Sequence, residues 1–204
     1  MEPALVALIT LLSYMLGSIP SAYIVGRLVK DIDIRTVGSR NVGALNTFHQ
    51  VGPGAAIAVL VADTLKGVLA ILLSVWIGES PWAILYGAIG VVAGHNWPVF
   101  LRFRGGKGAA TVLGVSLVVQ PWLTLIAVAA TVLTALPTRN VVLGAAVGFV
   151  LLNVLTVVSG QGWLQVIICL LLTFVVTATY LGRSWQQTVT ALRQRRLQDL
   201  FLFE

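Results

Sequence analysis

Two glycine-rich segments carry most of the residues that could bind an anion. The first, Arg104-Gly105-Gly106-Lys107-Gly108, directly precedes an apolar stretch. Glycines before a helix start leave backbone N–H groups free to surround an anion, and the helix dipole favours negative charge there. The segment lacks the Gly-x4-Gly-Lys-Ser/Thr spacing of a nucleotide P-loop. It therefore predicts a phosphate-binding turn, and the alternative is a basic turn that only contacts anionic lipid head groups.

The second segment runs from Gly38 to Asn46 and reads GSRNVGALN. Ser39, Asn41 and Asn46 offer neutral hydrogen-bonding groups, and Arg40 offers a planar fork that suits phosphate. Glycines let the backbone turn and approach a ligand closely. The segment predicts groups that orient a substrate, and the alternative is a polar loop whose side chains only cap the backbone.

Three ionisable residues fall inside apolar stretches, where they are costly. Asp63 and Lys66 stand three residues apart and so share a helix face. Such groups in a membrane helix usually face a functional cavity or one another. The pair therefore predicts either part of a site or an ion pair that fixes helix packing. His95, just before Asn96-Trp97-Pro98, is a candidate general base or a hydrogen-bonded structural histidine.

Other classes of site find no support in the sequence. The only histidines are His49 and His95, and Cys169 is the single cysteine, so no metal-ligand set is expected. No Gly-x-Ser-x-Gly turn predicts a serine nucleophile. The net charge of +6 could suggest nucleic acid, but the cations stand between apolar runs, and no recognition-helix pattern occurs. We expect neither a metal, a cofactor nor a nucleic-acid partner.

The elements that must position these residues are membrane helices. The chain is 58% hydrophobic and 10% charged, whereas a soluble domain carries about a quarter charged residues. No linker divides it, so residues 1–204 form one domain. Apolar runs long enough to span a bilayer cover 3–29, 53–77, 82–100, 141–158 and 163–181. The segment 30–52 is a loop with room for a short helix, and the basic tail 183–204 is expected to be helical.

Charge decides how the remaining stretch, 109–136, is interpreted. It is either one helix or two shorter helices broken at Gln120-Pro121. With two helices, all Lys and Arg residues except Lys66 lie on one side of the membrane, and the other side holds Glu2 and Glu79. Because Lys and Arg are enriched in cytoplasmic loops, this arrangement is favoured. It predicts an all-α bundle of about seven transmembrane helices, with the N-terminus outside and the C-terminus in the cytoplasm.

The motifs together resemble a known family. Gly17-Ser18-Ile19-Pro20, the segment 38–46, Asp63-Thr64-Leu65-Lys66-Gly67, Gly94–Phe100 and Gly105–Thr111 occur in the order found in bacterial glycerol-3-phosphate acyltransferases that use acyl phosphate. The match covers residues 14–115, and the predicted bundle accommodates the rest. Several motifs in register are more specific than any one of them.

The resemblance implies a function in phospholipid synthesis at the cytoplasmic face of the bacterial inner membrane. The acyl chain of an acyl phosphate passes to the 1-hydroxyl of glycerol 3-phosphate, giving lysophosphatidic acid without coenzyme A or acyl-carrier protein. The donor's phosphate accepts the hydroxyl proton. Ser39, Asn41, Asn46 and His95 are then the expected catalytic or orienting groups. Substrate and phosphate binding is expected of Arg40, His49, Lys66, Arg104, Gly105, Gly106, Lys107, Gly108 and Thr111, with Asp63 as the partner of Lys66.

This chain departs from the family pattern at three places. Arg40 stands where the family usually has glycine, and His49 stands where it has arginine. The family's His-x-x-Asn element near the C-terminus is absent, and Arg183 with Gln186 or Gln187 are candidate replacement donors. Two alternatives therefore stay open: a paralogue acting on another phosphorylated acceptor, or a non-enzymatic carrier of a phosphorylated metabolite. A carrier predicts inverted repeats and ionisable residues near the midplane.

Overall fold

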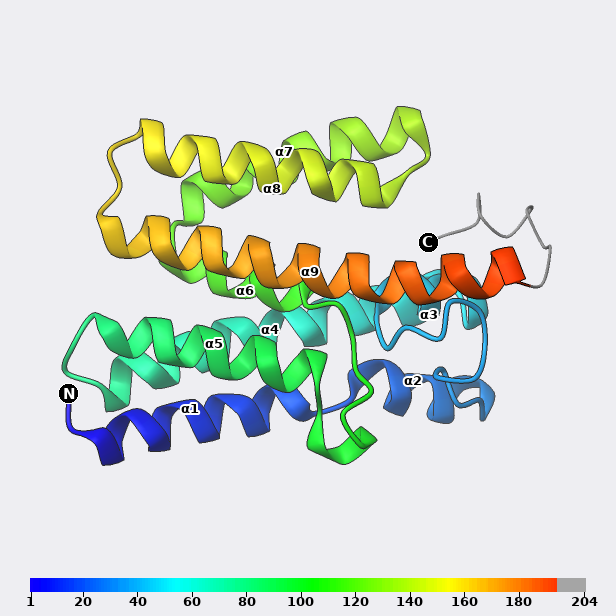
Figure 1. Cartoon of the computed structure of the whole chain (residues 1–204), viewed down its shortest axis with the longest axis horizontal. Helices are drawn as coiled ribbons and strands as arrows, with labels where there is room; N and C mark the ends of the chain where they lie inside the picture. The colour runs from blue at the N-terminus through cyan, green and yellow to red at the C-terminus, as the bar shows by residue number, and fades with distance from the viewer. Residues whose placement is uncertain (194–204) are drawn as a thin grey trace.

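The chain folds as a bundle of α-helices, shown in the computed structural model of Figure 1. The structure describes residues 1–193, except the side chains of residue 184 and residues 186–193. Its helices are α1 (Pro3–Ser18), α2 (Ser21–Lys30), α3 (Ala44–Gln50), α4 (Pro53–Ile77), α5 (Trp82–Asn96), α6 (Ala109–Val119), α7 (Pro121–Thr138), α8 (Val141–Val158) and α9 (Trp163–Arg193), with a 3-10 turn at Val99–Leu101. No strand occurs among the described residues, so the predicted all-α class is confirmed.

Six helical segments of the described chain are long and apolar enough to cross a membrane: Pro3–Lys30, Pro53–Ile77, Trp82–Leu101, Pro121–Thr138, Val141–Val158 and Trp163–Arg183. The predicted break at Gln120-Pro121 is confirmed, because α6 ends at Val119 and α7 begins at Pro121. With 11 residues α6 is about 16 Å long, whereas the hydrocarbon core is about 30 Å thick. The number of crossings and the orientation of the termini stay predictions.

The first apolar run differs from the expected single helix over 3–29. It breaks at Ile19-Pro20 into α1 and α2. Proline disfavours the helical conformation of the residue before it, and Ile19 accordingly has ψ 118°. The carbonyl of Ile19, freed from the helix ladder, accepts a hydrogen bond from the Lys66 ammonium of α4. A buried cation thus stabilises the break.

Glycines allow the central helices to approach one another closely. A Cβ on Gly94 of α5 would lie 2.1 Å from the carbonyl oxygen of Tyr14 in α1. A Cβ on Gly114 of α6 would lie 1.9 Å from the carbonyl oxygen of Thr64 in α4. Small residues at such crossings are typical of membrane helix packing. This packing holds α1, α4, α5 and α6 together, and the candidate functional side chains lie at one end of these helices.

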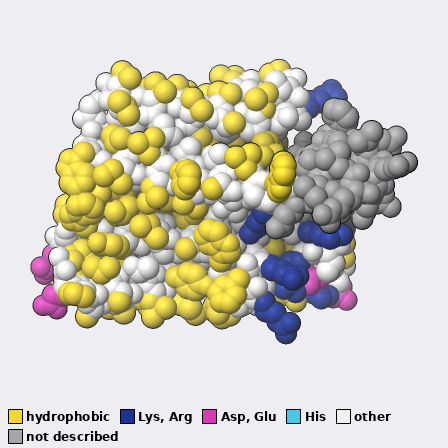
Figure 2. Space-filling model, in the orientation of Figure 1, with side chains coloured by type: hydrophobic (Ala, Val, Ile, Leu, Met, Phe, Trp, Pro, Cys, Tyr) yellow, Lys and Arg dark blue, Asp and Glu magenta, His cyan; other side chains and the backbone are white. Residues whose placement is uncertain are grey.

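Charge is distributed unevenly along the bundle. Figure 2 shows hydrophobic side chains covering its body, with Lys and Arg gathered at the end where α2, α3 and the C-terminal part of α9 lie in Figure 1. In the same view α6 and α7 run in opposite directions, which brings the α7–α8 turn to that end as well. We call this end of the molecule the cationic end.

Candidate active site

The glycine-rich turn between α5 and α6 is held against the end of α5. Gly106 N–H donates to the carbonyl of His95 at 3.0 Å. Gly108 has φ +88° and precedes the first residue of α6, which explains a glycine there. The amides of Lys107 and Gly108 make no hydrogen bond within the described part of the chain. The turn therefore presents free N–H groups beside a helix start, although the amide of Gly106, also predicted to bind phosphate, is already used.

The turn has no room for larger residues at its first two glycines. A Cβ on Gly105 would lie 2.2 Å from the carbonyl oxygen of His95 and 2.3 Å from Cδ of Pro98. A Cβ on Gly106 would lie 2.0 Å from Nε2 of His95. Both distances are far inside van der Waals contact. The glycines therefore set how closely the turn approaches the imidazole.

Lys107 is the cation that this turn positions. Its Nζ lies 4.2 Å from the ring centroid of Tyr180 in α9, a cation–π geometry. Burial, together with the smaller effect of the nearby charge of Arg183, lowers the pKa of its ammonium to about 8. Lys107 is thus a partly desolvated cation that is mostly charged at neutral pH.

Arg183 of α9 joins three segments of the site. One guanidinium nitrogen, Nη1, donates to the Gly105 carbonyl and to Oδ1 of Asn41, the latter at 3.3 Å. Nη2 donates to the Asn96 carbonyl at 3.0 Å. The sequence signalled Arg183 only as a candidate replacement for the missing His-x-x-Asn element, and its contacts were not predicted. The other candidates, the side chains of Gln186 and Gln187, lie outside the described residues.

Asn46 organises the first loop. Its Nδ2 donates to the carbonyls of Ile34, Val37 and Asn41 at 3.1, 3.2 and 3.0 Å, and its Oδ1 accepts from the Ser39 N–H at 3.1 Å. The side chain is buried, so these contacts shape the loop from inside. Its predicted contact with substrate stays a prediction, and the structure gives it a role in placing Ser39 and Asn41.

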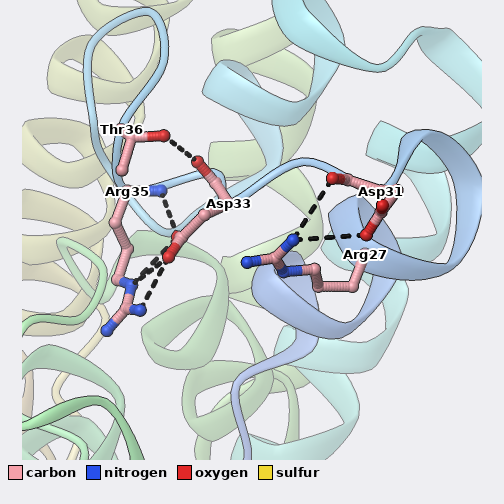
Figure 3. Close-up of polar contacts among 5 residues, drawn as sticks. All are labelled: Arg27, Asp31, Asp33, Arg35 and Thr36. Atoms are coloured by element: carbon pink, nitrogen blue, oxygen red, sulfur yellow. Dashed lines mark hydrogen bonds and ion pairs between the residues drawn. The ribbon is translucent and has the colours of Figure 1, made fainter.

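Ion pairs brace the segment that leads into this loop, as Figure 3 shows. Arg27 pairs with Asp31 at 3.2 Å, and Nη2 of Arg35 lies 2.7 Å from Oδ2 of Asp33. The hydrogen bonds from Arg35 hold the pKa of the Asp33 carboxyl below its usual value. Thr36 Oγ1 also donates to the Asp33 carbonyl at 2.8 Å. These contacts fix the start of the loop.

Asp63, Lys66 and His95 form a buried cluster below the turn. Lys66 Nζ lies 2.7 Å from Oδ1 of Asp63, which confirms that the two share a helix face. Nδ1 of His95 lies 3.7 Å from the same carboxylate oxygen. A small cavity is lined by all three side chains and by Gly105 and Val42 of the two loops. The predicted ion pair therefore adjoins the glycine turn as well as fixing the Ile19 carbonyl.

The remaining predicted residues lie at the edges of this site. Arg40, His49 and Arg104 are exposed at the cationic end. Arg40 has φ 59°, a left-handed conformation that favours glycine. Thr111, in the first turn of α6, is fully buried, and its hydroxyl has no hydrogen-bond partner in the described structure. The structure thus brings Asn41, His95, Gly105 and Lys107 together and leaves the exposed arginines farther out.

Comparison with known proteins identifies the family of this chain. The family model described as glycerol-3-phosphate acyltransferase matches residues 7–188. The chain belongs to the glycerol-3-phosphate acyltransferase family. A family member of that name from Desulforudis audaxviator is 40% identical over 184 residues, covering 90% of this chain and 91% of the relative. Another from Thermoanaerobacter sp. (strain X514) is 46% identical over 149 residues, covering 72% and 75%.

Solved structures of the family share the fold. The glycerol 3-phosphate form of PlsY (YgiH), an integral membrane glycerol 3-phosphate acyltransferase, superposes with a TM-score of 0.81 at 28% identity, covering 94% of this chain and 93% of that one. The lysophosphatidic acid form of the same protein has a TM-score of 0.79 at 27% identity over the same shares. This chain is therefore a membrane acyltransferase by family and by fold.

Proposed function

We propose that this acyltransferase moves the acyl chain of an acyl phosphate to the 1-hydroxyl of glycerol 3-phosphate at the cationic end of the bundle. The observation that carries the proposal is the meeting of Lys107, Arg183 and the amides of Lys107 and Gly108, which have no partner in the described part of the chain, beside a buried Asp63–Lys66 pair. Both substrates are phosphate esters or anhydrides, so a cationic pocket with free N–H groups suits each of them. The match to a glycerol 3-phosphate form of PlsY supports the acceptor.

The reaction needs one bond made and one broken. The 1-hydroxyl oxygen attacks the acyl carbonyl carbon, the bond from that carbon to the phosphate oxygen breaks, and inorganic phosphate leaves. The hydroxyl proton passes to the departing phosphate, so the protein need supply no separate base. Lys107 and the amides of Lys107 and Gly108 bind the phosphate group of glycerol 3-phosphate, and they stabilise the negative charge on the donor's phosphate as it leaves. Asn41 and Ser39, placed by Asn46, hold the acceptor close to the carbonyl.

His95 has a different part in this proposal. The imidazole ring of His95 lies between the Asp63 carboxylate and the Cα of Gly106. The ring therefore sets the distance between the glycine turn and the Asp63–Lys66 ion pair. Lys66 holds the α1–α2 break rather than the reacting phosphate, because its ammonium contacts Asp63 and the Ile19 carbonyl. Arg40 and Arg104 form a cationic rim that attracts the anionic substrates, and the exposed His49 lies at the same end of the molecule.

The site faces the cytoplasm in this proposal, and the protein spans the bacterial inner membrane. The positive-inside bias supports this orientation, because Lys and Arg gather at the cationic end. Water-soluble glycerol 3-phosphate then enters from the cytoplasm, and the acyl donor enters from the membrane.

Donor choice gives the sharpest test. The purified protein in detergent is supplied with labelled glycerol 3-phosphate and either palmitoyl phosphate or palmitoyl-coenzyme A, and lysophosphatidic acid is measured. We expect product with palmitoyl phosphate only. Lys107→Ala should reduce the rate, whereas Lys30→Ala, which removes an exposed cation at the same end, should not. Absence of product from folded protein, or equal use of the two donors, would defeat the proposal.

A further inference from the structure

Arg183 is an unusual arginine because all its hydrogen-bond partners in the described structure are neutral oxygens. They are the carbonyls of Gly105 and Asn96 and the side-chain oxygen of Asn41. No carboxylate lies within ion-pair distance of Arg183 among the described residues. The positive charge of Arg183 acts on the neighbouring ammonium of Lys107. Two half-buried cations side by side, without an acid, leave positive charge for an anion to neutralise.

Its three partners belong to three segments far apart in sequence. Asn41 is 142 residues away in the first loop, Asn96 is 87 residues away at the end of α5, and Gly105 is 78 residues away in the glycine turn. A guanidinium carries five N–H donors in a fixed plane, so one side chain can hold all three oxygens at once. Lysine at this position keeps the charge but loses the planar fork.

We propose that Arg183 is a positioning residue for acyl transfer, which clamps the glycine turn to Asn41 and α5 and holds a second positive charge beside Lys107 for the phosphate group. This inference rests on the proposed function. The clamp fixes the distance between the phosphate-binding turn and the loop that orients the acceptor. The charge favours phosphate in its doubly ionised form.

The two roles can be separated by two substitutions. Arg183→Lys keeps the charge and removes the clamp, whereas Arg183→Gln removes the charge as well. The groups that the structure places against Lys107 are Tyr180 and Arg183, both on α9. Losing the charge of Arg183 therefore raises the pKa of Lys107, and losing only the fork does not. Arg139→Gln, at the exposed α7–α8 turn, removes a cation from the same end of the molecule and is the control.

The experiment measures kcat and KM for glycerol 3-phosphate with palmitoyl phosphate between pH 6 and pH 10. Both Arg183 variants should lose roughly 10-fold or more in kcat/KM, because at least two of the three hydrogen bonds that join the turn, Asn41 and α5 are lost. The pH above which kcat/KM decreases should be the same as in the wild type for Arg183→Lys and higher for Arg183→Gln. Competitive acylation of the Lys107 amine, read by mass spectrometry, should show the same difference in pKa without any assay of activity.

Distinct results would overturn the inference. If both variants match Arg139→Gln in kcat/KM and pH profile, the clamp has no part in catalysis. If both lose activity together with thermal stability and the pKa of Lys107 is unchanged in each, Arg183 is a structural residue only. An inactive wild-type protein would defeat the proposed function instead, and the acylation measurement would still test the effect of Arg183 on Lys107.

Discussion

The close approach of the glycine turn to His95 makes Gly106→Ala a demanding test of the site. The added Cβ would lie 2.0 Å from Nε2 and 2.8 Å from Cε1 of His95, and 2.7 Å from the carbonyl oxygen of Val42. Gly106 is not among the residues with positive φ, so alanine fits the backbone conformation and the effect comes from space alone. The turn must therefore move away from both the imidazole and the first loop.

The size of this movement follows from the contact distances. An ordinary contact to Cβ is about 3.4 Å or more, so the turn and His95 must separate by about 1.4 Å. His95 is buried against Asp63 and has little room to retreat, so most of the shift falls on the turn and Lys107. Misplacement of binding groups by about 1 Å can lower a rate about 100-fold.

We therefore expect Gly106→Ala to lower kcat/KM for glycerol 3-phosphate about 100-fold. The measurement is lysophosphatidic acid formation by purified protein, with thermal unfolding in detergent followed alongside. Gly54→Ala is the matched control, because a Cβ there meets nothing within 4 Å and the site is at the exposed start of α4. Wild-type kinetics for Gly106→Ala in a folded protein would refute the proposed role of the turn.

Three further predictions concern the ion pair, the first loop and pH. Asp63→Ala leaves Lys66 buried without its partner, and thermal unfolding should show a loss of about 3 kcal/mol; an unchanged midpoint would contradict this. Arg40→Gly relieves a left-handed residue and should raise stability by about 1 kcal/mol in the same assay, and lower stability would count against it. Because the pKa of Lys107 is about 8, kcat/KM should fall about tenfold from pH 7 to pH 9. Between about pH 8 and pH 10.5 the Lys107 amine binds more protons in the unfolded protein than in the folded protein, so its contribution to the free energy of unfolding rises with pH while activity falls. If thermal stability and activity fell together over this range, the assignment of the pKa to Lys107 would be wrong.

Features of the fold that depend on local pattern or on overall charge were predictable from sequence. Asp63 and Lys66 pair because an i, i+3 spacing on one helix decides the geometry. The break at Gln120-Pro121 followed from the distribution of cations rather than from the apolar run itself. The break at Ile19-Pro20 was not predicted, although Pro20 is a local signal for it; the stabilising contact with Lys66 joins residues 47 apart and is not visible in the sequence.

The residues of the candidate site could be proposed from sequence, whereas most of their contacts could not. Lys107 and the glycine turn were identified correctly as neighbours of a helix start, since they are adjacent in sequence. Arg183 contacts three segments that only the packing of α9 brings together, and no local pattern reveals this. The side chain of Asn46 has the hydrogen-bonding groups expected of a substrate-binding residue, yet its hydrogen bonds are made within the first loop.

Direct binding of glycerol 3-phosphate is the measurement that tests the central claim most closely. The claim is that Lys107 and the glycine turn hold the phosphate group of the acceptor at the cationic end. Equilibrium dialysis with labelled glycerol 3-phosphate at pH 7 should show binding to the wild-type protein and to Lys30→Ala. Affinity should be at least about 10-fold weaker for Lys107→Ala, as expected for the loss of one charge-assisted contact. Equal affinity of Lys107→Ala and wild type would place the phosphate elsewhere and contradict the account.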